Sequence, residues 1–402
     1  MLASALGRLP IAMLSLAVLL YVHAVRGSFA VGGAVSAGIL AGTAVGMVVQ
    51  GRVVDRLGPT RPLLVVAALF AVAGGCLVVA VDRGSGLGPL VGLAVTTGLF
   101  SPAIEGASRA LWADLTPSGP VREAAYNYEA ISLEMFFILG PGLAALLVAT
   151  TPWPGTALVA AVGAMVAGTV LFALSPRVRV RSAAARRTRP VEQAGMLGVI
   201  RRPGLRTVAL ASLGFGLVVG SVEVGVPAAA AAAGSATAGG LLLSAWSVVS
   251  VAAGVLYGLR PWPRSMGRRL PVLLGAFAVL VGLTAMMASA RSLPLLAVTL
   301  LVAGATITPQ VTAHSHGVDL TAPDSSAAEA FSWVVTSAVI GVSAGQSLAG
   351  LAVDTAGPGG FAVGPVLGLV VAGVLWLRRR TVVADAAHPA AVSRADVVAP
   401  PA

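Results

Sequence analysis

Long apolar runs dominate this chain and constrain its fold more than any other feature. Twelve runs of roughly 18 or more apolar residues stand between turn-rich breaks, and they start near residues 9, 29, 62, 87, 124, 155, 205, 236, 271, 293, 326 and 358. A helix of about 20 residues crosses the hydrocarbon core of a bilayer. Because 57% of the residues are hydrophobic and only 10% are charged, a soluble fold could not solvate this surface. We therefore predict an all-α membrane protein with twelve transmembrane helices.

The distribution of arginine predicts the orientation of these helices. All 26 basic residues are arginine, and they lie mostly in the gaps between the apolar runs. With the N-terminus in the cytoplasm, the cytoplasmic segments hold 23 arginines, and the other side holds only Arg26, Arg83 and Arg291. The positive-inside rule then predicts a multi-pass protein of the cytoplasmic membrane with both termini in the cytoplasm. The net charge of +11 is explained by topology, so no nucleic-acid partner is expected.

One long connection divides the chain into two halves. Residues 177–204 are basic and lack apolar periodicity, which is typical of a cytoplasmic linker. The predicted organisation is an N-terminal six-helix bundle over residues 1–176, this linker, a C-terminal six-helix bundle over residues 205–380, and a disordered cytoplasmic tail over residues 381–402. The connections on the external side are too short to hold a folded domain.

The two halves also resemble each other in sequence at an offset of about 205 residues. Pro102 aligns with Pro309, and the triplet beginning at Asp114 aligns with the triplet beginning at Asp319. Further on, "GPGLAALL" from Gly140 aligns with "GQSLAGLA" from residue 345. Two like-oriented halves are typical of transporters in which a central cavity opens alternately to each side.

The stretch "GRVVDRLGPTR" links the second and third apolar runs and carries a specific resemblance. It resembles the cytoplasmic loop between helices 2 and 3 of the major facilitator superfamily, whose signature is close to G-x-x-x-D-R-x-G-x-x-R. The matching residues are Gly51, Asp55, Arg56, Gly58 and Arg61. The resemblance in span count, linker and duplication covers residues 1 to about 380, and it implies two six-helix bundles related by a pseudo-two-fold axis.

The resemblance also implies a gate at this loop. In the family, the aspartate accepts hydrogen bonds at the start of helix 11, where a carboxylate meets a positive helix end, and Asp55 is expected to do the same. Gly51 and Gly58 are expected to bracket the turn. The alternative is a solvated hairpin that only sets topology. The matching loop of the second half, "GLRPWPRSMGRR", has no aspartate, so only the first copy is expected to act as a gate.

Helix 5 carries a second, partial resemblance. The residues Gly140, Pro141 and Gly142 resemble part of the G-P-x-x-G-G motif of drug:proton antiporters, but alanine stands at 144 and 145 in place of the trailing glycines. Proline removes an intrahelical hydrogen bond, and glycine lets another helix approach closely, so we expect a break in the helix here. A plain packing kink without a coupling role is the alternative.

Acidic residues inside the spans are candidates for proton coupling or substrate contact, because charge is costly in hydrocarbon. Glu134 is predicted near the midplane of helix 5, where burial would favour its protonated form; a permanently neutral acid that locks the bundle is the alternative. Glu105 and Arg109 are four residues apart on helix 4 and can form an ion pair or touch substrate. Glu223 on helix 7 can join a proton path or only line a cavity.

Aromatic residues on helices 5 and 11 are candidates for the wall of the cavity. Phe137, Tyr128 and Trp333 are expected to flank it, unless they pack against lipid or the core. An apolar wall with few charges suits a lipophilic or weakly cationic solute.

No cofactor or metal site is expected. The single cysteine, Cys76, lies inside an apolar run, and His314 and His316 are two residues apart on a helix and point to different faces. Neither a P-loop nor a cluster of acids or histidines for membrane-embedded enzymology is present in the sequence, so an enzyme is not expected.

The predicted function is therefore secondary transport, with export of a small amphipathic drug or metabolite in exchange for protons. An importer of a sugar, nucleoside or organic acid on the same scaffold is the alternative. The expected partners are this solute, protons and the lipid bilayer, with the chain acting as a monomer.

Overall fold

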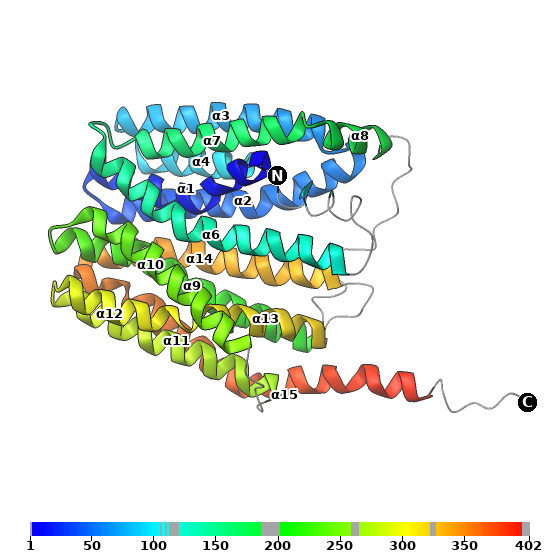
Figure 1. Cartoon of the computed structure of the whole chain (residues 1–402). Helices are drawn as coiled ribbons and strands as arrows, with labels where there is room; N and C mark the ends of the chain where they lie inside the picture. Colours follow the sequence, from blue (N-terminus) through cyan, green and yellow to red (C-terminus); the bar gives the residue numbers. More distant parts are fainter. Residues whose placement is uncertain are drawn as a thin grey trace, which may run out of the picture.

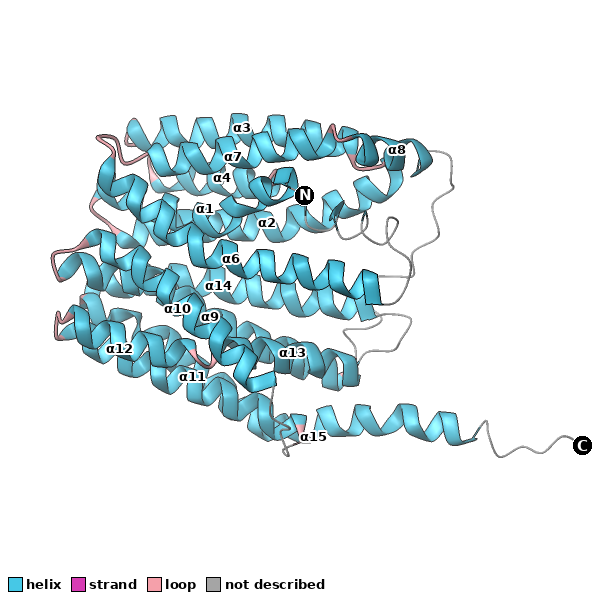
Figure 2. Cartoon of the chain, viewed as in Figure 1, coloured by secondary structure: helices cyan, strands magenta, loops and turns pink. Residues whose placement is uncertain are grey.

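Helices make up nearly all of the structure, a computed structural model that describes residues 2–104, 107–108, 111, 120–185, 202–258, 265–321 and 327–395 (Figure 2). Within these residues, 10 helices are long and apolar enough to span a membrane. Two shorter apolar helices, Leu87–Leu99 and Met135–Thr150, lie where the sequence predicts the fourth and fifth spans. This is the all-α architecture of twelve transmembrane helices predicted from the sequence.

The helices follow the chain in two groups of six spans. The first group is α1 (Leu2–Arg26), α2 (Phe29–Leu57), α3 (Thr60–Asp82), α4 (Leu87–Leu99), α6 (Pro120–Thr150) and α7 (Thr156–Ala173), and α8 (Pro176–Ala185) follows it. The second group is α9 (Pro203–Ala232), α10 (Ala236–Gly258), α11 (Met266–Ser289), α12 (Leu293–Gly304) with α13 (Ile307–Thr321) as one interrupted span, α14 (Ala327–Ala356) and, after the 3-10 turn η3 (Pro358–Ala362), α15 (Val363–Ala395). Every predicted start except the first agrees with these bounds to within five residues.

The two ends of the helices form different faces of the molecule. The connections at residues 27–28, 83–86, 151–155, 233–235 and 290–292 and at residue 357 gather at one end, on the left of Figure 1; we call it the short-loop face. The turn between α2 and α3, α8 and the beginning of α9 lie at the other end, which we call the linker face. The sequence predicts that the linker face is cytoplasmic.

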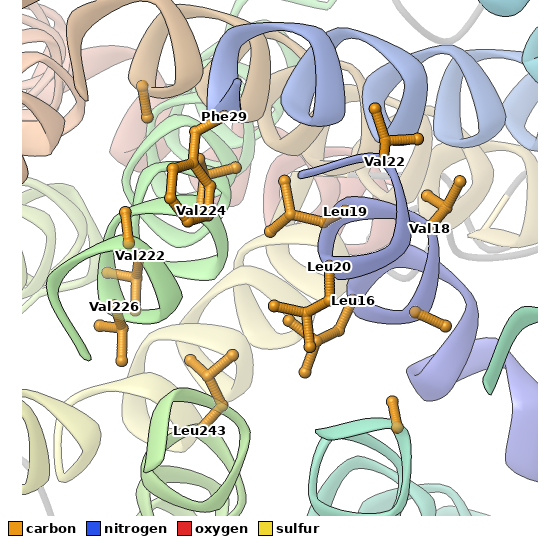
Figure 3. Close-up of a cluster of buried hydrophobic side chains, with 14 of the residues drawn as sticks. Leu16, Val18, Leu19, Leu20, Val22, Phe29, Val222, Val224, Val226 and Leu243 are labelled. Carbon is orange, nitrogen blue, oxygen red and sulfur yellow. The ribbon is translucent and has the colours of Figure 1, made fainter. Parts of the chain in front are cut away.

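The groups pack internally and meet along two pairs of helices. Within the first bundle α1 packs on α7 and α2 on α4, and within the second α9 and α11 pack on α15. Between the bundles, α2 packs on α14 and α6 on α10. A cluster of buried apolar side chains reaches across this boundary: Figure 3 shows Leu16 and Leu20 of α1 together with Val222 of α9 and Leu243 of α10.

A break in the fourth span and one in the tenth repeat the same feature in both bundles. Helix α4 ends at Leu99, shortly before Pro102, and α12 ends at Gly304, shortly before Pro309. Proline cannot donate a backbone hydrogen bond, so a helix is easily interrupted just before it. The side chain of Gln50 holds the first break: its Nε2 donates to the carbonyls of Leu99 (3.0 Å) and Ser101 (2.9 Å), and its Oε1 accepts from the backbone N–H of Ala103 (2.9 Å).

Three local expectations differ from the structure. Gly51 lies inside α2, which continues past it to Leu57. Of the two glycines, only Gly58, with φ of 76°, lies in the turn. Helix α6 continues through Pro141, since one missing backbone hydrogen bond is not enough to end a long apolar helix. Residues 381–395 continue α15 where the sequence predicts a disordered tail, and their alanine content favours a helix.

Candidate functional site

The bundles meet at two seams in which backbone approaches backbone. On the α2–α14 seam, a Cβ added to Gly33 would lie 2.6 Å from the carbonyl oxygen of Gln346. On the α6–α10 seam, a Cβ added to Gly240 would lie 2.6 Å from the carbonyl oxygen of Pro141. The two glycines are 207 residues apart and their partners 205 apart, so the seams are pseudo-equivalent. Both seams lie in the half of the molecule next to the short-loop face, and they hold the bundles together in that half.

A chain of polar side chains crosses the boundary between the bundles beside the α2–α14 seam. Gln346 of α14 donates from Nε2 to Oε2 of Glu223 on α9 (2.5 Å) and to Oγ of Ser15 on α1 (2.8 Å). The hydroxyls of Ser15 and of Ser36 on α2 are 2.7 Å apart. We call these four residues the polar chain; it joins one carboxyl group of the second bundle to two helices of the first.

The polar chain lies deep in the membrane-spanning region. Glu223 is nine residues from the end of α9, which places its Cα about 14 Å from the short-loop end of the helix. Its side chain is half-buried, whereas Gln346 is 1% exposed. The Oε1 atom of Gln346 is buried and has no hydrogen-bond partner among the described residues. An ionisable residue at this depth is a functional candidate, because burying it without a function would only destabilise the fold.

An apolar groove separates α2 from α14 on the linker side of the polar chain. Its volume is about 580 Å³. The lining is made of small, branched and hydroxyl side chains from the two helices: Ala41, Ala44, Val45, Val49, Thr336, Ile340, Ser343, Ala344 and Ser347. Val45, Val49 and Ile340 remain 58%, 53% and 51% exposed. On the short-loop side of Ala41, Oγ of Ser343 donates to the carbonyl of Ala37 (2.9 Å) and so links the two helices.

The predicted gate residues lie at the linker end of this arrangement. Asp55 and Arg56 are in the last turn of α2, but their side chains lie outside the described residues, as does the segment before α14. Gly58 is the buried C-cap of α2, and Arg61 is exposed on the first turn of α3. A Cβ added to Gly51 would meet no atom of the described residues within 4 Å, so no close approach among them requires glycine there.

The other predicted candidates are only partly described. Glu105 and Arg109 lie outside the described residues, and so do the side chains of Glu134 and Tyr128. Phe137 is 40% exposed on α6, and Trp333 is half-buried on α14.

The glycines around Pro141 pack against two different helices. A Cβ added to Gly140 would lie 2.8 Å from Cβ of Ala12 on α1. A Cβ added to Gly142 would lie 3.0 Å from Oγ of Ser244 on α10. This stretch of α6 therefore fits between its own bundle and the other one.

Several residues of the site were not singled out from the sequence. Gln346 was noted only for its place in the duplicated segment, and Ser15 and Ser36 not at all. A glutamine in the middle of an apolar run was the available signal for Gln346. Serine gives no such signal, because it is common in transmembrane helices and bonds easily to its own backbone.

The histidines and the cysteine form no candidate metal centre. Among the described residues, no group of three or more histidine, cysteine or acidic side chains is placed to hold a metal ion. His314 is 5% exposed, and its Nε2 lies 3.2 Å from Nε2 of Gln310 on the same helix. Cys76 is exposed on α3.

Two six-helix bundles that meet in one half of the membrane and are separated by a groove in the other define a membrane transporter. Residues 1–264 of the 402 match the family model described as Major Facilitator Superfamily. The chain belongs to the major facilitator superfamily, and both this family and the fold are those of a transporter rather than of an enzyme.

Several solved structures share this fold. One is a POT family transporter in complex with 5-aminolevulinic acid, with 12% identity, coverage of 94% of this chain and 95% of that chain, and a TM-score of 0.69. Another is the nucleoside transporter NupG, with 13% identity, coverage of 96% and 97%, and a TM-score of 0.68. A third is a D-xylose-proton symporter, with 14% identity, coverage of 93% and 96%, and a TM-score of 0.65. At these identities the likeness establishes the fold alone. The curated proteins include no match to this sequence.

Proposed function

We propose that this transporter is proton-coupled and moves small amphipathic molecules out of the cell by alternating access. The observation that carries the proposal is the polar chain, in which the carboxyl group of Glu223 is hydrogen-bonded to Gln346 at the boundary between the bundles. A carboxyl group that changes its protonation state at this boundary changes the bonds between the two halves. Proton binding and bundle movement are thereby coupled.

Gln346 is suited to transmit that change. In the structure its amide nitrogen donates to Glu223 and to Ser15, while its Oε1 meets no partner in the described part of the chain. An ionised carboxylate can only accept, whereas a protonated one also donates. Protonation of Glu223 would therefore favour the rotated amide, in which Oε1 accepts from the carboxylic acid and from the hydroxyl of Ser15. Protonation of Glu223 thereby alters the hydrogen bond between Gln346 and Ser15 of the first bundle.

The chemistry of the groove indicates the class of solute. Its lining combines alanine, valine and isoleucine side chains with the hydroxyls of three serine or threonine residues, Thr336, Ser343 and Ser347. Such a surface favours a molecule with a large apolar part and a few hydrogen-bonding groups. A sugar would leave most of its hydroxyls without partners there.

The gate motif and the topology complete the proposal. Asp55 lies at the linker end of α2, opposite the end at which α2 meets α14, and we propose that it closes the linker face when the short-loop face opens. The linker face is cytoplasmic, in the cytoplasmic membrane, and residues 1–176 and 205–380 move as two units within a monomer. Glu134, Glu105 and Arg109 remain candidates for contacts with the solute or the proton.

The test compares net transport with exchange in the Glu223→Gln variant. The chain is expressed in an efflux-deficient bacterium, and accumulation of a panel of amphipathic compounds is measured with and without a protonophore. We expect the wild type to lower accumulation of some compounds, and the protonophore to abolish this effect. Glutamine keeps the size and hydrogen-bonding capacity of the side chain but cannot titrate, so Glu223→Gln should lose net export while exchange of labelled for unlabelled compound continues.

The control is Ser347→Ala, which trims one hydroxyl from the groove and leaves every carboxyl in place. Its net export should stay sensitive to the protonophore. Wild-type export by Glu223→Gln at equal surface expression would refute the role of Glu223. Accumulation that is unchanged for every compound would refute export.

Import is the second candidate, and the structural neighbours favour it, since their names include a nucleoside transporter and a xylose-proton symporter. Cells expressing an importer would accumulate its solute instead of losing it. The same assay, extended to sugars, nucleosides and short peptides, separates the two directions.

A further inference from the structure

A carboxylate from the second bundle caps the first turn of a helix in the first bundle at the short-loop face. Oδ1 of Asp354, near the end of α14, accepts from the backbone N–H of Phe29 (3.0 Å), and Oδ2 accepts from the backbone N–H of Ala30 (3.0 Å). The hydroxyl of Ser28 donates to Oδ2 as well (2.5 Å). Three donors of α2 and its N-cap are thus satisfied by one side chain that lies more than 300 residues away in the sequence.

The chemistry of a helix start makes this contact favourable. The first backbone N–H groups of an α-helix have no partner within the helix, and the helix dipole attracts a negative charge at that end. Hydrogen bonds to a charged group are also stronger than those between neutral groups. The ring of His23 on α1 stacks on Phe29 with centroids 3.7 Å apart, and it lies close enough to Asp354 to interact with it electrostatically.

The contact has no counterpart at the equivalent position of the α6–α10 seam. At the offset of 205 residues, Ala149 of α6 stands where Asp354 stands in α14. The next residue, Thr150, donates its hydroxyl to the carbonyl of Leu146 in its own helix (2.7 Å). Alanine offers no carboxylate, so the start of α10 is not capped from this position of α6.

We propose that Asp354 is a latch that keeps the short-loop face closed during the transport cycle. When the bundles separate at this face, the N–H groups of Phe29 and Ala30 lose the carboxylate and must bond to water. The latch therefore biases the resting protein toward the state in which the short-loop face is shut. Asp354 is a positioning residue that acts on the movement of the bundles and touches no solute. The proposal needs neither the solute nor the coupling ion, so it stands apart from the proposed function.

The experiment measures the separation of the bundles at the short-loop face. Spin labels are attached to Arg83→Cys on the first bundle and Ala290→Cys on the second, both exposed, in a Cys76→Ala background. Distances between the labels are recorded by double electron–electron resonance in lipid nanodiscs, for the otherwise unchanged protein and for Asp354→Asn. Asparagine keeps one oxygen acceptor but removes the charge. If the closed state loses about 1.4 kcal/mol of stabilisation, the equilibrium between the closed and the open state shifts tenfold.

We expect Asp354→Asn to raise the ratio of the longer-distance to the shorter-distance population about tenfold. The control is Thr355→Ala, at the next position, whose exposed hydroxyl donates only to carbonyls of its own helix; it should leave the distances unchanged. Ser28→Ala removes one of the three bonds and should give a smaller shift. Distance distributions that coincide for Asp354→Asn, Ser28→Ala and the control would overturn the proposal. If Asp354→Asn does not fold, Ser28→Ala alone decides.

Discussion

The substitution Gly33→Ala tests whether the seams hold the bundles together. A Cβ at this position would lie 2.6 Å from the carbonyl oxygen of Gln346, whereas ordinary van der Waals contact begins at 3.4 Å, so the two backbones must part by about 0.8 Å. A main-chain carbonyl cannot rotate away, and α2 and α14 must therefore move as bodies. Overpacking of this kind costs about 1–3 kcal/mol. This cost falls only on the state that is closed at the short-loop face. We therefore expect the ratio of the open to the closed population to rise about 5- to 150-fold.

The spin-label pair at Arg83 and Ala290 reports this shift directly. Gly240→Ala makes the same change on the pseudo-equivalent seam and should act in the same direction. Gly75→Ala on α3 is the control, since no atom lies within 4 Å of the added Cβ, and it should leave the distances unchanged. If Gly33→Ala and Gly240→Ala both fold and both give the distances of the control, the seams do not set the equilibrium and the reasoning is refuted.

Two further predictions concern stability and topology. Replacing Gln50 by leucine leaves the carbonyls of Leu99 and Ser101 and the N–H of Ala103 without their partner. We expect the free energy of unfolding to fall by about 3–5 kcal/mol, visible as a lower unfolding temperature in detergent. The control Thr96→Ala removes a hydrogen bond within α4 and should change the unfolding temperature little. A fluorescent protein fused to the C-terminus should fluoresce, and alkaline phosphatase fused there should stay inactive, because the arginine distribution predicts a cytoplasmic terminus; the reverse pattern would invert the orientation.

The fold could be predicted from the sequence because its signals are long and repeated. Twelve apolar runs and a duplication specify the spans and their division into two bundles. The turn glycines were harder: Gly58 has the positive φ expected of a turn, but Gly51, in the same motif, is an ordinary helical residue. A motif shows which residues occur together, and it does not show which of them bends the chain.

The site could be predicted only in part, because it is assembled from residues on different helices. Glu223 was a candidate through its charge alone. Its partner Gln346 is 123 residues away, Ser15, to which Gln346 bonds in turn, is 208 residues away, and the sequence contains no signal that joins them. Asp354 was not singled out from the sequence, because an acidic residue at the end of a span is normally solvated. Its role depends on the start of α2 lying against the end of α14, which is a fact of packing between the bundles.

The seams have a consequence for the speed of the transport cycle. At Gly33 and Gly240 a glycine Cα faces a main-chain carbonyl, and Gly240 also faces the methyl group of Ala145, so no side chain has to leave one rotamer for another when the surfaces part at these points. Contacts of this kind are individually weak and break one after another as the helices tilt. We therefore expect these points to add little to the activation barrier. The slow step of turnover should then lie where hydrogen bonds to a carboxyl group are exchanged.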